Sequence, residues 1–233
     1  MNLLIQPIKN RLLAGLSPEE LAELIQHLEP VTLPKKQVLY EVGAPLDRVY
    51  FLEEGLASVL TTMEDGASSE VGMVGPEGLV GASALLGGRI SAQHVVMQLS
   101  GRGHHIAAKH CKSIFDQSAE VRRVVLRFIE DLLNLSSQTA GCNRLHTVEQ
   151  RSARWLLMAS DRIGSNELPL TQEFLAAMLG VRRSGVSEAM SELQRSGLVR
   201  YRRGEIRIVD RAGLEATACE CYRLDKQRVE RLL

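Results

Sequence analysis

The sequence predicts an α+β protein whose first half is a β-barrel and whose second half is helical. Between Val31 and Lys109, short apolar runs alternate with glycine, proline and Asp-Gly corners, which is typical of a compact antiparallel barrel or sandwich. A long helical pattern follows from about Ser118 to Asn143. Beyond Thr171, two short helical runs precede two short alternating strands, which indicates a helix-turn-helix and a β-hairpin. We therefore expect a barrel domain over residues 1–116, a connecting helix and hinge over 117–145, and a winged helix-turn-helix domain over 146–233.

The composition is that of a globular protein with one basic region. The chain has 233 residues and a mass of 25.7 kDa, with 45% apolar and 24% charged residues. Its formal net charge is zero, but residues 180–211 contain eight arginines against four acidic residues. Such a local basic surface favours a polyanionic partner that binds to one face of the protein.

The sequence also bears on the compartment. Residues 1–10 lack the basic region and long apolar core of a signal peptide, and no window approaches the ~18–20 apolar residues of a membrane span. The four cysteines suit reduced thiols better than a disulfide framework. We expect a cytoplasmic protein without a membrane partner.

Short apolar segments separated by turn residues mark the strands of the expected barrel. A helical lead precedes them, with Ser17 as its cap and Pro18 in its first turn. A turn at Pro76 leads into a short helical segment that ends near Leu86. The strand candidates are Gln37–Val42, Val49–Leu52, Ala57–Thr61, Glu70–Val74 and His94–Leu99.

The long helix carries a heptad seam. Its inward residues fall at alternating spacings of four and three: Val121, Val125, Phe128, Leu132, Leu135, Thr139 and Cys142. We expect this seam to be the interface of a homodimer, because a dimer presents its two recognition helices one DNA turn apart. The alternative is that the seam packs on the barrel of its own chain. Gly141 and Asn143 lower the helical propensity near the end, where we place the hinge.

Residues 171–193 have the pattern of a helix-turn-helix. Thr171 is a good N-cap, and Gly180 stands where the first helix must end in a left-handed residue. A further helix, Val148–Arg162, is expected to pack against this unit. The inward faces are apolar and comprise Leu175, Met178 and Leu179 in the first helix and Val186, Ala189, Met190 and Leu193 in the second.

The outward face of the second helix carries side-chain types that read base edges. Arginine pairs with guanine, glutamate accepts from cytosine, and serine adapts to either. These residues crowd the N-terminal half of the helix, which enters the major groove in this motif. The candidates for DNA binding are Arg182, Arg183, Ser184, Ser187 and Glu188, together with the cap residue Thr171. The alternative is an αα-hairpin whose polar face is only solvated.

A basic β-hairpin follows directly. Residues 199–201 and 206–208 alternate in polarity around a turn at Arg203-Gly204. The hairpin carries Arg200, Arg202, Arg203 and Arg207. A hairpin in this place is a wing, and we expect Arg202 and Arg203 to contact phosphates.

Three stretches carry a resemblance to a known family. They are VLYEVGAPLDRVYFLEEGLASV with Gly43 and Gly55, GPEGLVGASALLGGRISA, and LTQEFLAAMLGVRRSGVSEAMSEL. With the order barrel, long helix and winged helix-turn-helix, nearly the whole chain resembles the Crp/Fnr family, the cyclic-AMP receptor protein and its relatives. The resemblance implies a barrel of the cupin-like, cyclic-nucleotide-binding type, which is a double-stranded β-helix. It also implies a homodimeric transcription regulator that binds and bends double-stranded DNA at a palindromic site, with RNA polymerase as a candidate further partner.

Within that resemblance, Arg183 matches the arginine that reads a guanine in the half-site. The neighbouring family glutamate is replaced by Ser184, and a second family arginine is replaced by Glu188. We therefore expect a base preference different from that of the cyclic-AMP receptor protein.

The effector pocket is where the sequence departs from the family. Members that bind cyclic nucleotide have a glutamate for the ribose and an arginine–serine pair for the cyclic phosphate. When the chain is aligned on Gly81, those glutamate and arginine positions hold Ala82 and Ile90, and Arg89 is one place off. Ser136 and Ser137 match the hydroxyl pair that contacts the adenine. The pocket implied by the resemblance therefore comprises Gly81, Ala82, Ser83, Arg89, Ser91, Ser136 and Ser137.

Burial of a cyclic phosphate without its charge partner is costly. We therefore expect a degenerate pocket, or an effector other than cyclic AMP, and we assign no cofactor. A cyclic-nucleotide-responsive regulator with the same architecture is the alternative.

The cysteines and histidines are the candidate ligands for a metal. Iron–sulfur members of the family carry clustered cysteines near the N-terminus, whereas the first cysteine here is Cys111. Cys219-x-Cys221, His104-His105 and His110-Cys111 offer ligand chemistry for a metal or haem, but ordinary packed or exposed side chains explain them more simply. We therefore expect no metal site.

An enzyme is the remote alternative. A metal-dependent cupin-like enzyme would place several histidines and a glutamate on facing strands, whereas the six histidines of this chain are scattered. The sequence also lacks the G-x-S-x-G, P-loop and H-E-x-x-H motifs. We expect no enzymatic activity.

Overall fold

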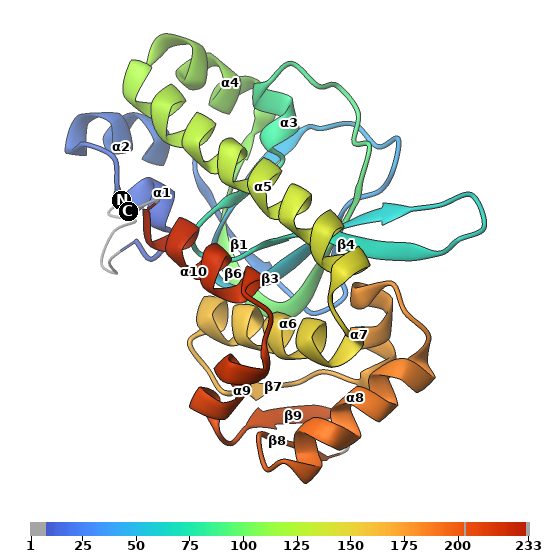
Figure 1. Cartoon of the computed structure of the whole chain (residues 1–233). Coiled ribbons are helices and arrows are strands. Elements are labelled where there is room, and N and C mark those ends of the chain that lie inside the picture. The colour runs from blue at the N-terminus through green and yellow to red at the C-terminus, as the bar shows by residue number, and fades with distance from the viewer. Residues whose placement is uncertain (1–7, 203, 232–233) are drawn as a thin grey trace. The chain divides into compact units, whose positions relative to one another are not determined.

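A computed structural model describes residues 8–202 and 204–231 of the chain. These residues form two compact units (Figure 1). The N-terminal unit contains residues 8–59 and 73–133, and the C-terminal unit contains residues 60–72 and 134–230. Residues 60–72, at the far end of a hairpin of the barrel, thus belong to the same unit as the helix-turn-helix.

The barrel is built from one six-stranded sheet. Four strands are paired in the order β1 (Glu29–Leu33), β6 (His94–Ala107), β3 (Arg48–Thr62) and β4 (Ser68–Val74). The short strand β2 (Val38–Tyr40) pairs with β6, and β5 (Leu79–Val80) pairs with β3. The sheet confirms the expected β-rich first half, with β3 and β6 longer and β2 shorter than the sequence pattern suggested.

Glycines explain the difference in strand length. The two segments expected around residues 49–52 and 57–61 are one continuous strand, because Gly55 lies inside β3 with a φ of +89°. A Cβ atom at Gly55 would lie 2.8 Å from the carbonyl oxygen of Leu99 on β6. A Cβ atom at Gly101 would lie 1.9 Å from the carbonyl oxygen of Glu54. These glycines allow close approach of two strands and do not form corners.

Short helices surround the sheet within the N-terminal unit: α1 (Arg11–Ala14), α2 (Pro18–Ile25), α3 (Ala82–Leu85) and α4 (Ala108–Gln117). Asn10 caps α1, and its amide also donates to the carbonyl oxygens of Leu52 (2.9 Å) and Gly78 (2.8 Å). These bonds fix the helical lead to the barrel. The helix α4 was not expected from the sequence.

The helix α5 (Ala119–Leu145) carries the residues of the expected dimer seam. Val121, Val125 and Phe128 belong to the buried core of the N-terminal unit, and Leu132 packs against that core. The Phe128 ring occupies the space that a Cβ atom at Gly78 would need, 2.2 Å away. Leu135 is also buried within its own chain. The first half of the seam is therefore covered by the N-terminal unit of its own chain, and a heptad pattern alone does not say which surface covers it.

The C-terminal unit is a helical scaffold around a small sheet. Its elements are α6 (Val148–Ile163), β7 (Glu167–Leu168), α7 (Gln172–Leu179), α8 (Arg183–Arg195), β8 (Val199–Arg202), β9 (Glu205–Ile208), α9 (Arg211–Thr217) and α10 (Cys221–Arg231). The strands pair in the order β7-β9-β8. The helices α9 and α10 are separate, because Ala218 has an extended backbone conformation.

Among the described residues, no helix is both long and apolar enough to cross a bilayer.

Candidate nucleic-acid interface

The helix-turn-helix forms as its residue pattern predicts. The Thr171 hydroxyl accepts from the backbone N–H of Phe174 (3.1 Å), and Gly180 ends α7 in a left-handed conformation with a φ of +61°. The expected inward residues Leu175, Met178, Leu179, Val186, Ala189, Met190 and Leu193 are all buried. Because this face of α8 packs inward, its polar face is left outward.

The helix α6 supports α7 with side chains that the sequence analysis did not single out. The buried guanidinium of Arg151 donates to the carbonyl oxygen of Leu179, which lies at the C-terminal end of α7. The Trp155 ring meets the Phe174 ring edge-on at 6.3 Å. The Trp155 indole N–H donates to Glu70 Oε1 (2.8 Å), a carboxylate of the hairpin segment 60–72. The helical spacing of apolar residues in α6 predicts a face that packs inward, but it does not predict which residues that face contacts.

The N-terminal end of α8 presents the expected polar residues. Arg182, Arg183, Ser184 and Glu188 are exposed, and Ser187 is half-buried. Arg182 is the N-cap and makes no side-chain capping bond, so water or a ligand must satisfy the first N–H groups of α8. Two arginines beside the positive end of a helix dipole form a surface suited to a phosphate or a base edge.

The wing follows in the expected register. Val199 pairs with Ile208, Arg200 with Arg207, and Arg202 with Glu205. Arg200 and Arg202 are exposed, whereas Arg203 lies outside the described residues.

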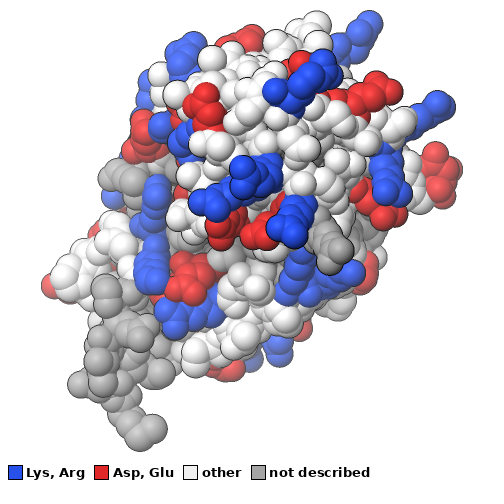
Figure 2. All heavy atoms as spheres, turned by 90° about the horizontal axis from the view of Figure 1, so that it is seen from below, with Lys and Arg blue, Asp and Glu red and all other residues white. Residues whose placement is uncertain are grey.

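The wing is fastened to the recognition helix. The backbone N–H of Tyr201 on β8 donates to the side-chain oxygen of Gln194 on α8 (2.8 Å). Figure 2 looks from below at the side on which α8 and the wing lie, and it shows Lys and Arg side chains in several separate groups with Asp and Glu between them. On this face, basic and acidic side chains are therefore interspersed.

Comparison with known proteins identifies the two parts of the chain. The family model of the Crp-like helix-turn-helix domain matches residues 150–217, and that of the cyclic nucleotide-binding domain matches residues 30–117. The CRP-like cAMP-activated global transcriptional regulator of Mycobacterium tuberculosis is 24% identical over 205 residues, which cover 84% of this chain and 91% of the relative. The transcriptional regulatory protein btr of Bordetella pertussis is 29% identical over 210 residues, with coverages of 84% and 83%. The solved structure of FixK2 from Bradyrhizobium japonicum has a TM-score of 0.71 at 17% identity and covers 82% of this chain and 98% of its own.

The chain belongs to the Crp/Fnr family. Crp/Fnr proteins are transcription regulators that bind DNA through the helix-turn-helix, and the family is not one of enzymes. The expected family, fold class and regulatory function are thereby confirmed.

In this Crp/Fnr protein, the segment around α3 has few polar groups to offer an anion. Gly81 has a φ of +97°, and a Cβ atom there would lie 2.7 Å from the carbonyl oxygen of Arg48. Ala82 is half-buried, while Ser83 and Arg89 are exposed. Ile90, which we expected at the position of the family arginine, is 63% exposed.

The hydroxyl groups expected in the pocket are engaged elsewhere or exposed. The buried Ser91 hydroxyl donates to the Gln93 carbonyl oxygen (2.7 Å) and accepts from the Gln93 N–H (3.2 Å). The Ser136 hydroxyl donates to the Val71 carbonyl oxygen (2.8 Å), and Ser137 is exposed. Ser136 and Ser137 belong to the C-terminal unit, whereas the other expected pocket residues belong to the N-terminal unit.

Proposed function

We propose that this Crp/Fnr regulator binds a palindromic DNA site as a homodimer, with the N-terminal end of α8 from each copy in a major groove. The observation that supports this most directly is the exposure of Arg182 and Arg183 on a helix whose opposite face is fully packed. Arg183, Ser184, Ser187 and Glu188 would then face base edges, and Thr171 and Arg202 would lie near the DNA backbone.

The homodimer needs a contact other than the buried seam. Leu126 and Leu133 on α5 are 43% and 65% exposed and stand one heptad apart. Two exposed leucines on one helical face form a surface that a second copy of α5 would cover. We assign the dimer contact to this face of the helix.

For the effector, we propose that the barrel does not bind cyclic AMP in the manner of the family's cyclic-nucleotide receptors. Ala82 and Ile90 offer neither the carboxylate nor the guanidinium of such a pocket, and the Ser91 hydroxyl is already engaged in its own turn. The M. tuberculosis relative is cAMP-activated by name. A cyclic-nucleotide response is therefore the second candidate, favoured only by that relative and by the matching domain model.

Selection of binding sites from random duplex DNA tests the DNA proposal. The selected sequences should be palindromes whose half-sites lie about 10–10.5 base pairs apart, centre to centre, or a multiple of that spacing. Asymmetric sites, or no enrichment at low salt, would overturn the proposal.

The same selection with and without cyclic AMP tests the effector proposal. Cyclic AMP should leave the selected sequence and its affinity unchanged. Tighter binding with cyclic AMP would establish the second candidate in its place.

A further inference from the structure

Four side chains that could bind a metal meet in the C-terminal unit. They are Cys142, His146, Cys219 and Cys221, whose ligand atoms all lie within 4.8 Å of one another. The three cysteines are buried, with exposed fractions of 1%, 4% and 0%, and His146 is half-buried. None of these side chains has a place in DNA binding.

Two chain segments bring the four side chains together. Cys142 and His146 stand four residues apart at the end of α5, and the backbone bond from His146 N–H to the Cys142 carbonyl oxygen (3.1 Å) keeps them on one helical face. Cys219 and Cys221 lie where α9 gives way to α10, and the Tyr222 N–H donates to the Cys219 carbonyl oxygen (3.1 Å) in that turn. The ligand pattern is therefore C-x3-H from one segment and C-x-C from the other.

The distances suit one tetrahedral ion. With Zn–S bonds of about 2.3 Å and Zn–N bonds of about 2.0–2.1 Å, neighbouring ligand atoms in a tetrahedron lie roughly 3.6–3.8 Å apart. The Sγ atoms of Cys142 and Cys219 are 3.6 Å apart, and Cys221 Sγ lies 3.7 Å from His146 Nδ1. A disulfide needs sulfur atoms about 2.0 Å apart, so the sulfurs of Cys142 and Cys219 are unbonded.

Neighbouring side chains orient the ligands as in known metal sites. His146 turns Nδ1 toward Cys221, while its Nε2 lies 3.2 Å from the carboxylate of Glu220. A carboxylate on the far ring nitrogen fixes the tautomer and the ring orientation of a histidine ligand. Gln138 Nε2 donates to Cys221 Sγ (3.0 Å), a bond that favours a thiolate.

Binding of an ion to the three cysteines would displace their thiol protons to solvent.

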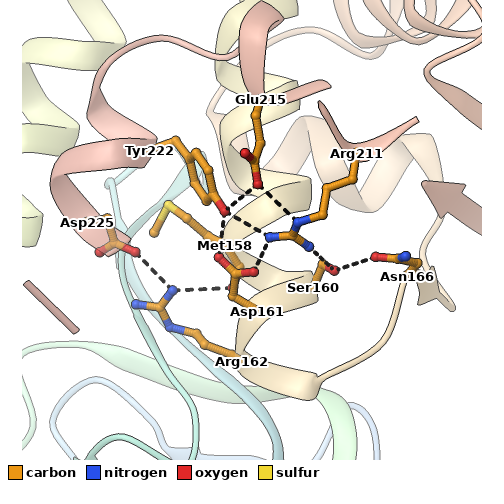
Figure 3. A network of polar contacts seen from close by, with 9 residues as sticks. All are labelled: Met158, Ser160, Asp161, Arg162, Asn166, Arg211, Glu215, Tyr222 and Asp225. Atoms are coloured by element: carbon orange, nitrogen blue, oxygen red, sulfur yellow. Dashed lines mark hydrogen bonds and ion pairs between the residues drawn. The ribbon is translucent and has the colours of Figure 1, made fainter. Parts of the chain in front are cut away.

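A polar network holds the second segment in place (Figure 3). The Arg211 guanidinium of α9 contacts Asp161 of α6 and also Glu215 (3.0 Å). The Tyr222 hydroxyl donates to Asp161 Oδ2 (2.9 Å). Figure 3 also shows the buried ion pair between Arg162 and Asp225 (3.1 Å), which fastens α10 to α6. Cys219 and Cys221 are thus held by a scaffold that does not depend on a metal.

We propose that Cys142, His146, Cys219 and Cys221 form a closed tetrahedral site for one Zn²⁺ ion per chain. Four protein ligands leave no open position for substrate, so the ion is structural. It links the end of α5 to the start of α10 within the C-terminal unit. Cys219-x-Cys221 is visible in the sequence, but only the fold brings Cys142 and His146 to it.

The test uses the full-length protein, reduced, stripped with a chelator and titrated with Co²⁺ as a spectroscopic probe. We expect one Co²⁺ per chain, with thiolate-to-cobalt charge-transfer bands and the visible bands of tetrahedral cobalt. Addition of Zn²⁺ should abolish both sets of bands. Competition with a chelator then gives the Zn²⁺ affinity.

Matched variants locate the site. Cys219→Ser should abolish the charge-transfer bands or weaken metal affinity by more than about tenfold, whereas Cys111→Ala, which removes the fourth cysteine of the chain, should change nothing. Glu220→Gln changes an exposed side chain that is not a ligand, so the fold should persist while Zn²⁺ affinity falls about 10–100-fold.

Three results would overturn the proposal: no cobalt bands in the folded wild type, metal affinity unchanged by Cys219→Ser, or a Cys142–Cys219 disulfide as the only product under the same reducing conditions.

Discussion

The recognition helix α8 and the segment from Gly81 to Ser91 carry their polar groups in opposite situations. On α8, the arginines stand exposed at a helix N-terminus over a packed apolar face. In the other segment, the Ser91 hydroxyl is engaged in its own turn, and Ala82 and Ile90 are apolar. The contrast teaches that the polar groups of α8 remain free to meet a partner, whereas the Ser91 hydroxyl is already bonded within its own turn.

The largest expected effect is the loss of stability when a charge is placed on the covered face of α5. The same change on the exposed face should not cause it. Phe128→Asp should lower the free energy of unfolding of the N-terminal unit by more than about 4 kcal/mol, because it buries a charge in the barrel core. Denaturant unfolding followed by circular dichroism measures this.

Leu133→Asp is the matched variant on the exposed face. It should leave the barrel folded and shift the protein from dimer to monomer in sedimentation. If Leu133→Asp has no effect on the mass while Phe128→Asp yields a folded monomer, the two faces have been assigned the wrong way round.

The next effect tests whether α8 depends on its packed side. Leu193 is fully buried, so Leu193→Ala should lower the free energy of unfolding of the C-terminal unit by about 2–5 kcal/mol. Ser191→Ala, on the exposed face two residues earlier, should leave stability nearly unchanged. Equal losses in the two variants would mean that the two faces of α8 are not different.

A smaller effect is expected on the affinity of the barrel for cyclic AMP. Ala82→Glu combined with Ile90→Arg restores the charge types of a cyclic-nucleotide receptor and should tighten cyclic AMP binding about tenfold, or ~1.4 kcal/mol. Calorimetry measures the binding, and each single variant serves as a control. If the wild-type protein already binds cyclic AMP as tightly as the double variant does, the proposal that its pocket is unsuited to cyclic AMP is wrong.

The smallest effect concerns the wing. Arg202→Ala should weaken binding to every duplex alike and reduce the salt slope by about one. Affinities for specific and random duplexes at several salt concentrations check this. A loss confined to one sequence would assign Arg202 to a base instead of a phosphate.

Local patterns predicted the helix-turn-helix well, because caps, a glycine C-cap and helical spacing act within a few residues. Thr171 and Gly180 have the expected roles. The barrel was predictable in class only: Gly55 suggested a corner, and its real role depends on a strand more than forty residues away.

Long-range partners account for the remaining differences. The heptad pattern of α5 correctly predicted an apolar face. It could not predict that Phe128 packs against Gly78, fifty residues earlier in the chain. Cys142 and His146 showed no sign of a site on their own, because the other half of the cluster comes from residues 219–221.

The most direct test of the central claim is the base preference of Arg183→Ala on the selected palindrome and on every single-base change within one half-site. If Arg183 lies in the major groove, the variant should lose discrimination at one base pair in each half-site and keep it elsewhere. Arg195→Ala, which changes an arginine at the other end of α8, should keep the whole preference. A uniform loss across all positions, or an unchanged preference at every position, would contradict the placement of α8 in the groove.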